Sequence, residues 1–138
     1  MSGIIISDDK TKFPVEKAIE LLHTTYWAEK RDPEVIRKSI ENSIVFGVYS
    51  EDSLIGMARV ITDFATTFYL ADVIIDEKYR GNGIGKKLIS TIVSDNRFSS
   101  LLGILVTRDA HGLYEHFGFR KECERAMTKK IIEKDIGD

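Results

Sequence analysis

The sequence lacks the features that mark secreted, membrane-spanning and nucleic-acid-binding proteins. Its one cysteine, Cys123, excludes a disulfide within the chain and fits a reducing compartment. No apolar run approaches the roughly 20 residues of a membrane span, and the three isoleucines at positions 4–6 have no charged leader or small-residue cleavage site. The net charge is −2, without a basic run. We therefore expect a cytoplasmic protein without nucleic-acid or membrane partners.

The composition indicates one folded domain. The chain has 138 residues, 43% hydrophobic and 30% charged, enough to bury a core. It shows no internal repeat, linker or low-complexity segment, so we expect a single domain over 1–138. The three histidines lack cysteines or carboxylates at ligand spacing, and no metal site is expected.

The apolar pattern predicts alternating strands and helices. Strands are expected at 3–7, 44–49, 54–61, 68–75 and 101–107, with further strand segments at 119–121 and 125–130 completing the sheet. Helices are expected over 14–28, from 33 to 41, from 84 onward and over 111–117. Pro14 suits a helix start, Asp32 caps the helix at Pro33, and Gly118 ends the last one. The tail over 133–138 is expected to fray.

The order of these elements predicts a mixed α/β (α+β) sheet with helices on both faces. The strands at 44–49 and 54–61 should form an antiparallel hairpin. The strands at 68–75 and 101–107 are joined through a helix, so they should be parallel with a right-handed crossover. The inner face of the helix from 33 would carry Val35, Ile36 and Ile40.

The most informative stretch runs from Asp72 to Lys86. Val73, Ile74 and Ile75 form a β-branched run typical of a strand covered on both faces. The glycine-rich turn at 80–85 then leads into a helix whose apolar face carries Ile84, Leu88, Ile89 and Ile92. A helix N-terminus behind such a turn binds phosphate well, and Lys78, Arg80, Lys86 and Lys87 add positive charge.

Two common nucleotide-binding motifs fail on spacing. A dinucleotide fingerprint from Gly81 would place its third glycine at Lys86, and the acidic ribose partner would fall in an apolar run at 101–105. A P-loop would need Ser or Thr where Lys87 stands. A nucleotide-binding α/β module is therefore disfavoured.

The pattern that does fit is Arg/Gln-x-x-Gly-x-Gly/Ala, carried by Arg80, Gly83 and Gly85. Here the chain resembles the GNAT superfamily of N-acetyltransferases. A second block, Asp109-Ala-His-Gly-Leu-Tyr-Glu-His-Phe-Gly-Phe119, is similar to the family's later Leu-Tyr-x-x-x-Gly-Phe signature at a family-like distance. The resemblance spans essentially the whole chain and is greatest to small single-domain bacterial members.

The resemblance implies a fold and a cosubstrate. The fourth and fifth strands would splay apart and admit the pantetheine arm of acetyl-CoA. The cofactor-binding residues would be those of the fourth strand and the glycine turn: Val73, Ile74, Ile75, Arg80, Gly81, Asn82, Gly83, Ile84, Gly85 and Lys86. Backbone groups of Val73 and Ile75 would pair with the cofactor, with the Val73 N–H near the acetyl carbonyl.

Two residues are candidate catalysts. Tyr114 occupies the tyrosine position of the later signature and would protonate the leaving sulfur; alternatively it is a core tyrosine on an amphipathic helix. Asp72 would be the base, directly or through water. A carboxylate within an apolar strand is costly unless paired, so an ion pair with Arg59 is the competing interpretation. Asp109 is expected to cap a helix rather than catalyse.

The resemblance further implies that Trp27, Arg59 and Asp63 border an acceptor cleft, although Trp27 and Tyr26 could simply pack the first helix. The leading function is acetyl transfer to a small-molecule or peptide primary amine in a ternary complex. Alternatives are a longer acyl donor, an oxygen acceptor, or a weakly catalytic CoA-binding sensor. The mildly acidic balance is compatible with cationic acceptors, and a homodimer through an exposed edge of the last hairpin is compatible with the family.

Overall fold

A computed structural model of the chain describes residues 3–130. Five strands form one sheet in sequential order, with every neighbouring pair antiparallel except the parallel β4–β5 pair. The strands are β1 Ile4–Ser7, β2 Ile44–Ser50, β3 Ser53–Thr62, β4 Thr67–Ile75 and β5 Leu102–Ile104. The helices are α1 Val15–His23, α2 Pro33–Glu41, α3 Ile84–Val93 and α4 His111–Glu115, with 3₁₀ turns η1 Lys10–Lys12 and η2 Glu77–Tyr79. The predicted mixed α/β class is confirmed.

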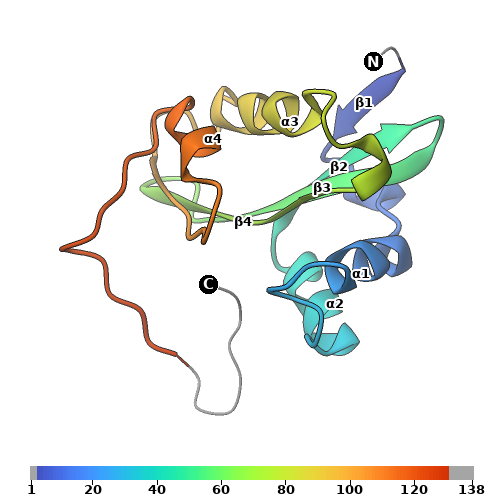
Figure 1. Cartoon of the computed structure of the whole chain (residues 1–138), viewed down its shortest axis with the longest axis horizontal. Coiled ribbons are helices and arrows are strands. Elements are labelled where there is room, and N and C mark those ends of the chain that lie inside the picture. The colour runs from blue at the N-terminus through green and yellow to red at the C-terminus, as the bar shows by residue number, and fades with distance from the viewer. Residues whose placement is uncertain (1–2, 131–138) are drawn as a thin grey trace.

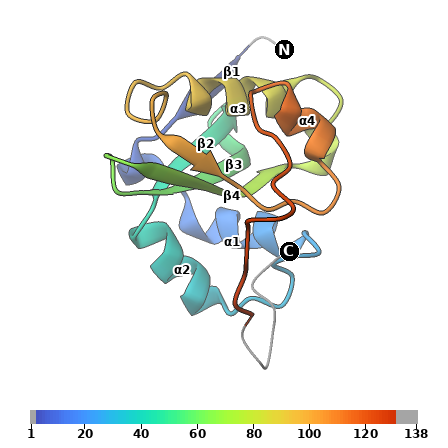
Figure 2. The same cartoon turned by 90° about the vertical axis from the view of Figure 1, so that its left-hand side faces the viewer.

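The sheet separates two hydrophobic cores. Helices α3 and α4 cover one face and α1 and α2 the other, as Figures 1 and 2 show. Phe46, Leu88 and Phe98 lie in the core beneath α3 and α4, whereas Leu22 and Met57 belong to the core beneath α1 and α2. Alternate residues of a strand point to opposite faces, so the central strands supply both cores.

Two helices begin where predicted. In α3 the expected face is buried, with Ile84, Leu88, Ile89 and Ile92 all at most 4% exposed. Helix α2 starts at Pro33, and the Asp32 carboxylate accepts a hydrogen bond from the Glu34 N–H at 2.7 Å. The assignment of Val35 to its inner face was wrong, because that side chain is half exposed.

Helix α1 is shorter than predicted, ending at His23 instead of residue 28. The hydroxyls of Thr24 and Thr25 donate to the carbonyls of Leu21 and Leu22, at 2.6 and 2.7 Å. Side-chain bonds to the last carbonyls compete with further helical turns. Tyr26 and Trp27 consequently lie in the loop after α1, outside its buried face.

A bulge interrupts β4 at its centre. Arg59 pairs with Ala71 and Met57 with Ile74, so two residues of β4 oppose Ala58 alone. Asp72 takes a positive φ of 53° there, which is unusual for a residue with a side chain. Strand β5 pairs with β4 only over Leu102–Ile104, rather than the predicted 101–107, so the two strands part beyond Tyr69. The splay implied by the family resemblance is present.

The C-terminal part of the described chain does not complete the sheet. The strands predicted at 119–121 and 125–130 are absent, and residues 120–130 are exposed and form no strand or helix (Figure 1). Five of the six residues at 120–125 are charged, so this segment has little apolar surface to bury. Phe119, just before this segment, packs edge-on against Phe68 and Tyr114. The expectation for 133–138 lies outside the described residues. No helix within 3–130 is long and apolar enough to cross a bilayer.

Candidate active site

The turn between β4 and α3 is held in shape before any ligand binds. Gly81 and Gly83 have φ values of +84° and +75°, which glycine adopts without steric cost, and Gly83 is the N-cap of α3. The Arg80 Nε donates to the carbonyl of Ile75 at 2.9 Å, and the Asn82 side chain donates to the carbonyl of Tyr79 at 3.1 Å. The first N–H groups of α3 therefore have fixed positions, and helix geometry leaves them without intrahelical acceptors.

This turn forms one end of a cavity of about 1350 Å³. The cavity follows the splayed part of β4, whose edge from Leu70 to Ile75 has no strand partner on the β5 side. Its far end is lined by residues from the α1–α2 loop and β3, including Trp27, Arg31 and Arg59. The volume exceeds what one small ligand needs, so there is room for a cofactor and a second substrate.

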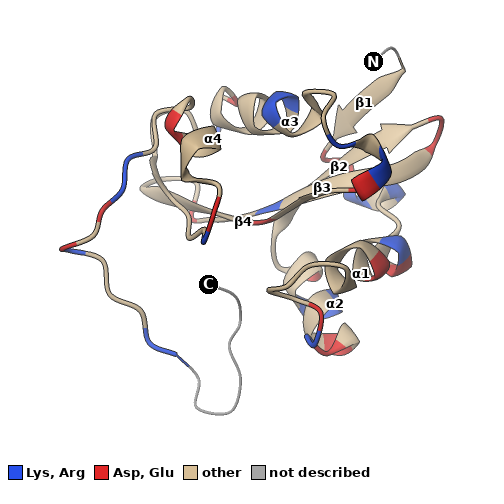
Figure 3. Cartoon of the chain, in the orientation of Figure 1, with Lys and Arg blue, Asp and Glu red and all other residues tan. Residues whose placement is uncertain are grey.

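Most of the predicted cofactor-binding residues line this cavity. They are Val73, Ile74, Ile75, Arg80, Gly81, Gly83, Ile84, Gly85 and Lys86. Asn82 is outside the lining and instead braces the turn. Figure 3 shows basic segments in this turn and at the start of α3, next to the mixed charges of η2. The cavity end therefore combines positive charge with bare backbone donors, a combination that suits phosphate groups.

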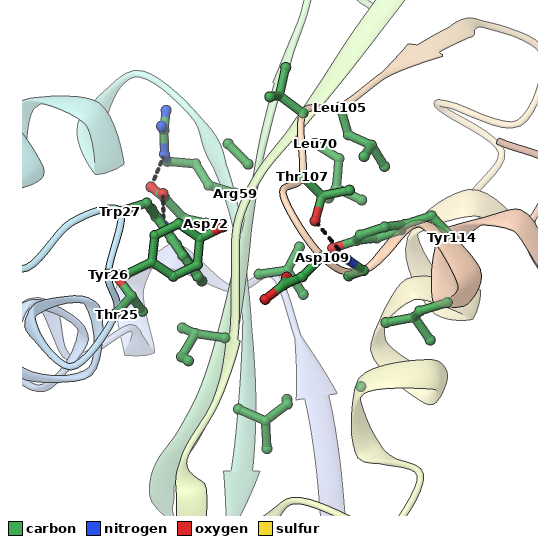
Figure 4. Close-up of a pocket in the computed structure, with 18 of the residues that line it drawn as sticks. Thr25, Tyr26, Trp27, Arg59, Leu70, Asp72, Leu105, Thr107, Asp109 and Tyr114 are labelled. Atoms are coloured by element: carbon green, nitrogen blue, oxygen red, sulfur yellow. Dashed lines mark hydrogen bonds and ion pairs between the residues drawn. The ribbon is translucent and has the colours of Figure 1, made fainter. Parts of the chain in front are cut away.

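Tyr114 lies on α4 with its ring directed toward β4 (Figure 4). It is 8% exposed and lines the cavity, and its ring meets that of Phe119 edge-on with centroids 6.0 Å apart. Burial raises the pKa of Tyr114 to about 12, because the ionised form would lose its hydration. The hydroxyl therefore keeps its proton at neutral pH. Its general-acid role stays a prediction that this position and protonation state support.

Asp72 lies in a buried ion-pair cluster on the other side of β4 (Figure 4). Its Oδ2 accepts from the Arg59 Nε at 2.9 Å and from an Arg31 Nη at 3.0 Å. The Trp27 Nε1 donates to Oδ1 at 3.1 Å. The Asp72 side chain is only 3% exposed, so these three protein groups, and not bulk water, stabilise its carboxylate. The ion pair with Arg59 considered from the sequence is present.

These partners make Asp72 a weak base. Burial alone would raise the pKa of Asp72, but the charges of Arg59 and Arg31 and their hydrogen bonds outweigh it and hold the pKa below its ordinary value. A carboxylate stabilised in its ionised form has little tendency to accept a proton. The base role of Asp72 stays a prediction, and the contacts favour a positioning role.

The predicted acceptor residues are placed differently from one another. Trp27 and Arg59 line the cavity through the Asp72 cluster. Asp63 does not line it; this carboxylate accepts from the backbone N–H groups of Thr66 and Ala65 at 2.8 and 2.9 Å and closes the β3–β4 turn. Hydrogen bonds from that turn, those of Thr66 first, hold the pKa of Asp63 well below its ordinary range. Asp63 is therefore fully used by the turn.

The loop before α4 differs from the sequence prediction. The N-cap of α4 is Ala110, with no side-chain capping bond, so the expectation that Asp109 caps this helix was wrong. Instead, the Thr107 Oγ1 accepts from the Ala110 N–H at 3.1 Å and fixes the loop. Both Thr107 and Asp109 line the cavity, on the side of Tyr114.

Two contacts could not be anticipated from sequence. Arg31 meets Asp72 across 41 residues, and neither spacing nor pattern indicated the pair. The guanidinium of Arg108 stacks on the Tyr26 ring, with its carbon 3.6 Å from the ring centroid. This contact joins the α1–α2 loop to the loop before α4 at the Trp27–Arg59 end of the cavity. Aromatic residues in the α1–α2 loop and one arginine in the loop before α4 were the only signal.

The sequence of this chain is similar to those of known acetyltransferases. The model of the acetyltransferase (GNAT) domain matches residues 41–121. GCN5-related N-acetyltransferase 2 of Arabidopsis thaliana is 33% identical over 76 residues, covering 54% of this chain and 30% of that protein. The chain spans between about a third and a half of the length of the curated relatives it matches.

Solved structures of GNAT-family proteins have the same fold as this chain. A GNAT-family protein from Xanthomonas campestris pv. campestris superposes with a TM-score of 0.89 at 29% identity, covering 95% of both chains. A GNAT family acetyltransferase from Elizabethkingia anophelis with acetyl-CoA bound shares the fold at 19% identity, with a TM-score of 0.66 and coverage of 87% and 78%. The family model covers more than half of the sequence, and the chain therefore belongs to the GNAT family of acetyltransferases.

Proposed function

We propose that this protein transfers an acetyl group from acetyl-CoA to a primary amine by direct attack in a ternary complex. The observation that carries the proposal is the continuity of one cavity from the phosphate-suited turn, along the open edge of β4, to the Trp27–Arg59 end. Such a cavity can hold a cofactor and an acceptor side by side. Membership of a family of acetyltransferases supports the same reaction class.

The cofactor would follow the cavity from the turn before α3 along β4, leaving the Trp27–Arg59 end to the acceptor. Its pyrophosphate would meet the N–H groups at the start of α3 and the charges of Arg80 and Lys86, and its pantetheine would pair with the open edge of β4. Acetyl-CoA in the Elizabethkingia anophelis structure, which shares this fold, supports that choice of ligand.

The reaction needs a proton donor for the departing sulfur and direct access of the amine to the thioester. The buried Tyr114 hydroxyl keeps its proton at pH 7 and can give it to the thiolate. A covalent route through cysteine gains no support, since Cys123 is exposed and lies outside the cavity lining. Direct attack by the amine on the thioester is therefore the proposed path.

The alternative is a sensor that binds CoA without turnover. The neutral, buried Tyr114 beside an open second compartment favours an enzyme, because a sensor needs neither an acid nor room for an acceptor. A sensor would bind acetyl-CoA and release no thiol with any amine.

The test begins with calorimetric titration of the chain with acetyl-CoA, with NADH and ATP as controls. Micromolar binding of acetyl-CoA alone is expected, followed by amine-dependent thiol release. Binding of a nucleotide control in place of acetyl-CoA would contradict the cofactor assignment. Tight acetyl-CoA binding without transfer across an amine panel would support the sensor.

A further inference from the structure

We propose that Asp109 binds the ammonium group of the acceptor and takes up its proton during transfer. The proposal rests on the amine acetylation proposed above. It assigns the acid–base partner of Tyr114 to the loop before α4 instead of to β4.

Asp109 has no structural task in the described chain. It does not cap α4, whose N-cap is Ala110, and the hydroxyl of Thr107 accepts the Ala110 N–H in its place. Within residues 3–130 no hydrogen bond or ion pair involves the Asp109 carboxylate. Asp109 is exposed, so its carboxylate is solvated and available to a cationic ligand that enters the cavity.

The position of Asp109 suits the reaction. Its side chain projects from the loop toward β4, into the gap toward which the Tyr114 ring also points (Figure 4). Both residues line the same cavity. An acceptor that reaches the thioester beside Tyr114 would therefore bring its nitrogen near Asp109.

The other carboxylate of the cavity is already engaged. Among the described residues, Asp72 and Asp109 are the acidic side chains that line it. Asp72 is held by Arg59, Arg31 and Trp27 and has a lowered pKa. The two guanidinium groups give the cluster around Asp72 a net positive charge, which does not attract an ammonium group. The unpaired carboxylate of Asp109 does attract one.

The proton balance is as follows. The bound ammonium passes one proton through Asp109 to solvent, and the neutral nitrogen attacks the thioester carbon. As the N–C bond forms and the C–S bond breaks, water takes the second proton from nitrogen and Tyr114 gives its proton to sulfur. Tyr114 then regains a proton from water. The products are the amide and CoA thiol, with one proton released overall.

The test compares two nucleophiles with different needs for a base. 2-Phenylethylamine is largely protonated at pH 7, since alkylamines have a pKa of about 10.4. Hydroxylamine is already unprotonated at that pH. Both would be assayed with saturating acetyl-CoA in a Cys123→Ser background, because the exposed Cys123 thiol would react with thiol reagents. Hydroxamate formation gives hydroxylamine transfer an independent readout.

Asp109→Asn should lower kcat/KM for 2-phenylethylamine by about 10²-fold, a typical contribution of a general base. Transfer to hydroxylamine and the Kd for acetyl-CoA should stay close to wild type, and Asp109→Glu should recover part of the loss. Glu115→Gln, an exposed change on the adjacent helix α4 outside the cavity lining, is the matched control and should change neither rate.

The outcomes distinguish failure of the Asp109 role from failure of the proposed function. Unchanged transfer to 2-phenylethylamine by Asp109→Asn, or equal losses with both nucleophiles, would overturn the role of Asp109 while leaving amine acetylation intact. A wild-type protein that binds acetyl-CoA but acetylates no member of the amine panel, these two nucleophiles included, would overturn the proposed function itself.

Discussion

Tyr114 is a residue whose environment decides its protonation. Replacing it with Phe should lower kcat by about 10²-fold, the usual contribution of a general acid. The Kd for acetyl-CoA should change little, because the ring and its contact with Phe119 remain. Stopped-flow thiol release and calorimetric titration would separate the two effects. Equal turnover by the Phe variant would leave Tyr114 as a core residue.

The raised pKa of Tyr114 should also make the stability of the fold depend on pH in alkaline solution. The pKa of Tyr114 is about 12 in the fold against an ordinary value of 10.0. Between these pH values the Tyr114 hydroxyl therefore ionises only in the unfolded chain. Its contribution to stability is therefore complete below pH 10 and is lost as the pH rises toward 12. Denaturant unfolding across this range should show a decline that Tyr114→Phe reduces.

Asp72 holds two guanidinium groups in a buried cluster. Asp72→Asn should reduce the free energy of unfolding by about 3 kcal/mol, because two buried charges lose their counter-ion. The matched control is Glu16→Gln, which removes an exposed partner of Arg37 and should have little effect. Urea unfolding of both variants would check the contrast.

The pH dependence of this effect has a definite sign. The folded pKa of Asp72 lies below its ordinary 3.8, so the cluster stabilises the fold above that pH and loses its contribution as the pH falls through the folded value. The difference between wild type and Asp72→Asn should therefore shrink in acid. A difference that stayed constant while Asp72 became protonated in the folded state would show that charge pairing is not its source.

At the scale of elements, the turn before α3 depends on one backbone conformation. Gly83→Ala should cost about 1 kcal/mol, since φ of +75° is unfavourable for a residue with a Cβ even where space is open. It should also weaken acetyl-CoA binding by displacing the first N–H groups of α3. Gly85→Ala is the control: its Cβ would lie 3.8 Å from Ile75, an ordinary contact. Thermal unfolding and titration of both variants would test the turn.

Elements were predictable where their own residues determine them. The apolar spacing of α3 and the cap of α2 are local signals, and both gave the correct start. The early end of α1 depends on Thr24 and Thr25 turning back to bond carbonyls, which propensity does not reveal. The bulge at Asp72 has no glycine to mark it, and the missing C-terminal strands show that an apolar alternation needs a partner edge as well as a pattern.

The same limit applies to the site. The cofactor turn was predictable because one contiguous motif makes it. The Asp72–Arg31 pair and the unpaired Asp109 arise from segments far apart in the chain, which only the fold brings to one cavity.

The whole molecule should respond to its cosubstrate. A ligand present at 100 times its Kd adds about 2.7 kcal/mol to the free energy of unfolding when it binds only the folded state. Acetyl-CoA should therefore raise the melting temperature by about 9 °C for a domain of this size, whereas ATP should not. Differential scanning calorimetry would measure both. An equal rise with ATP would point to a general nucleotide site.

The brief pairing of β4 with β5 bears on local opening of the domain. Three residue pairs join β5 to the sheet, and Leu102 and Ile104 are largely exposed, so few contacts oppose its detachment. Amide hydrogens of β5 should exchange with deuterium earlier than those of β2 and β3, which pair along most of their length. The loop that carries Asp109 follows β5 directly. The half of the site that performs the chemistry would thus belong to the part of the molecule that opens first, and a bound cofactor lying between β4 and β5 would slow that opening.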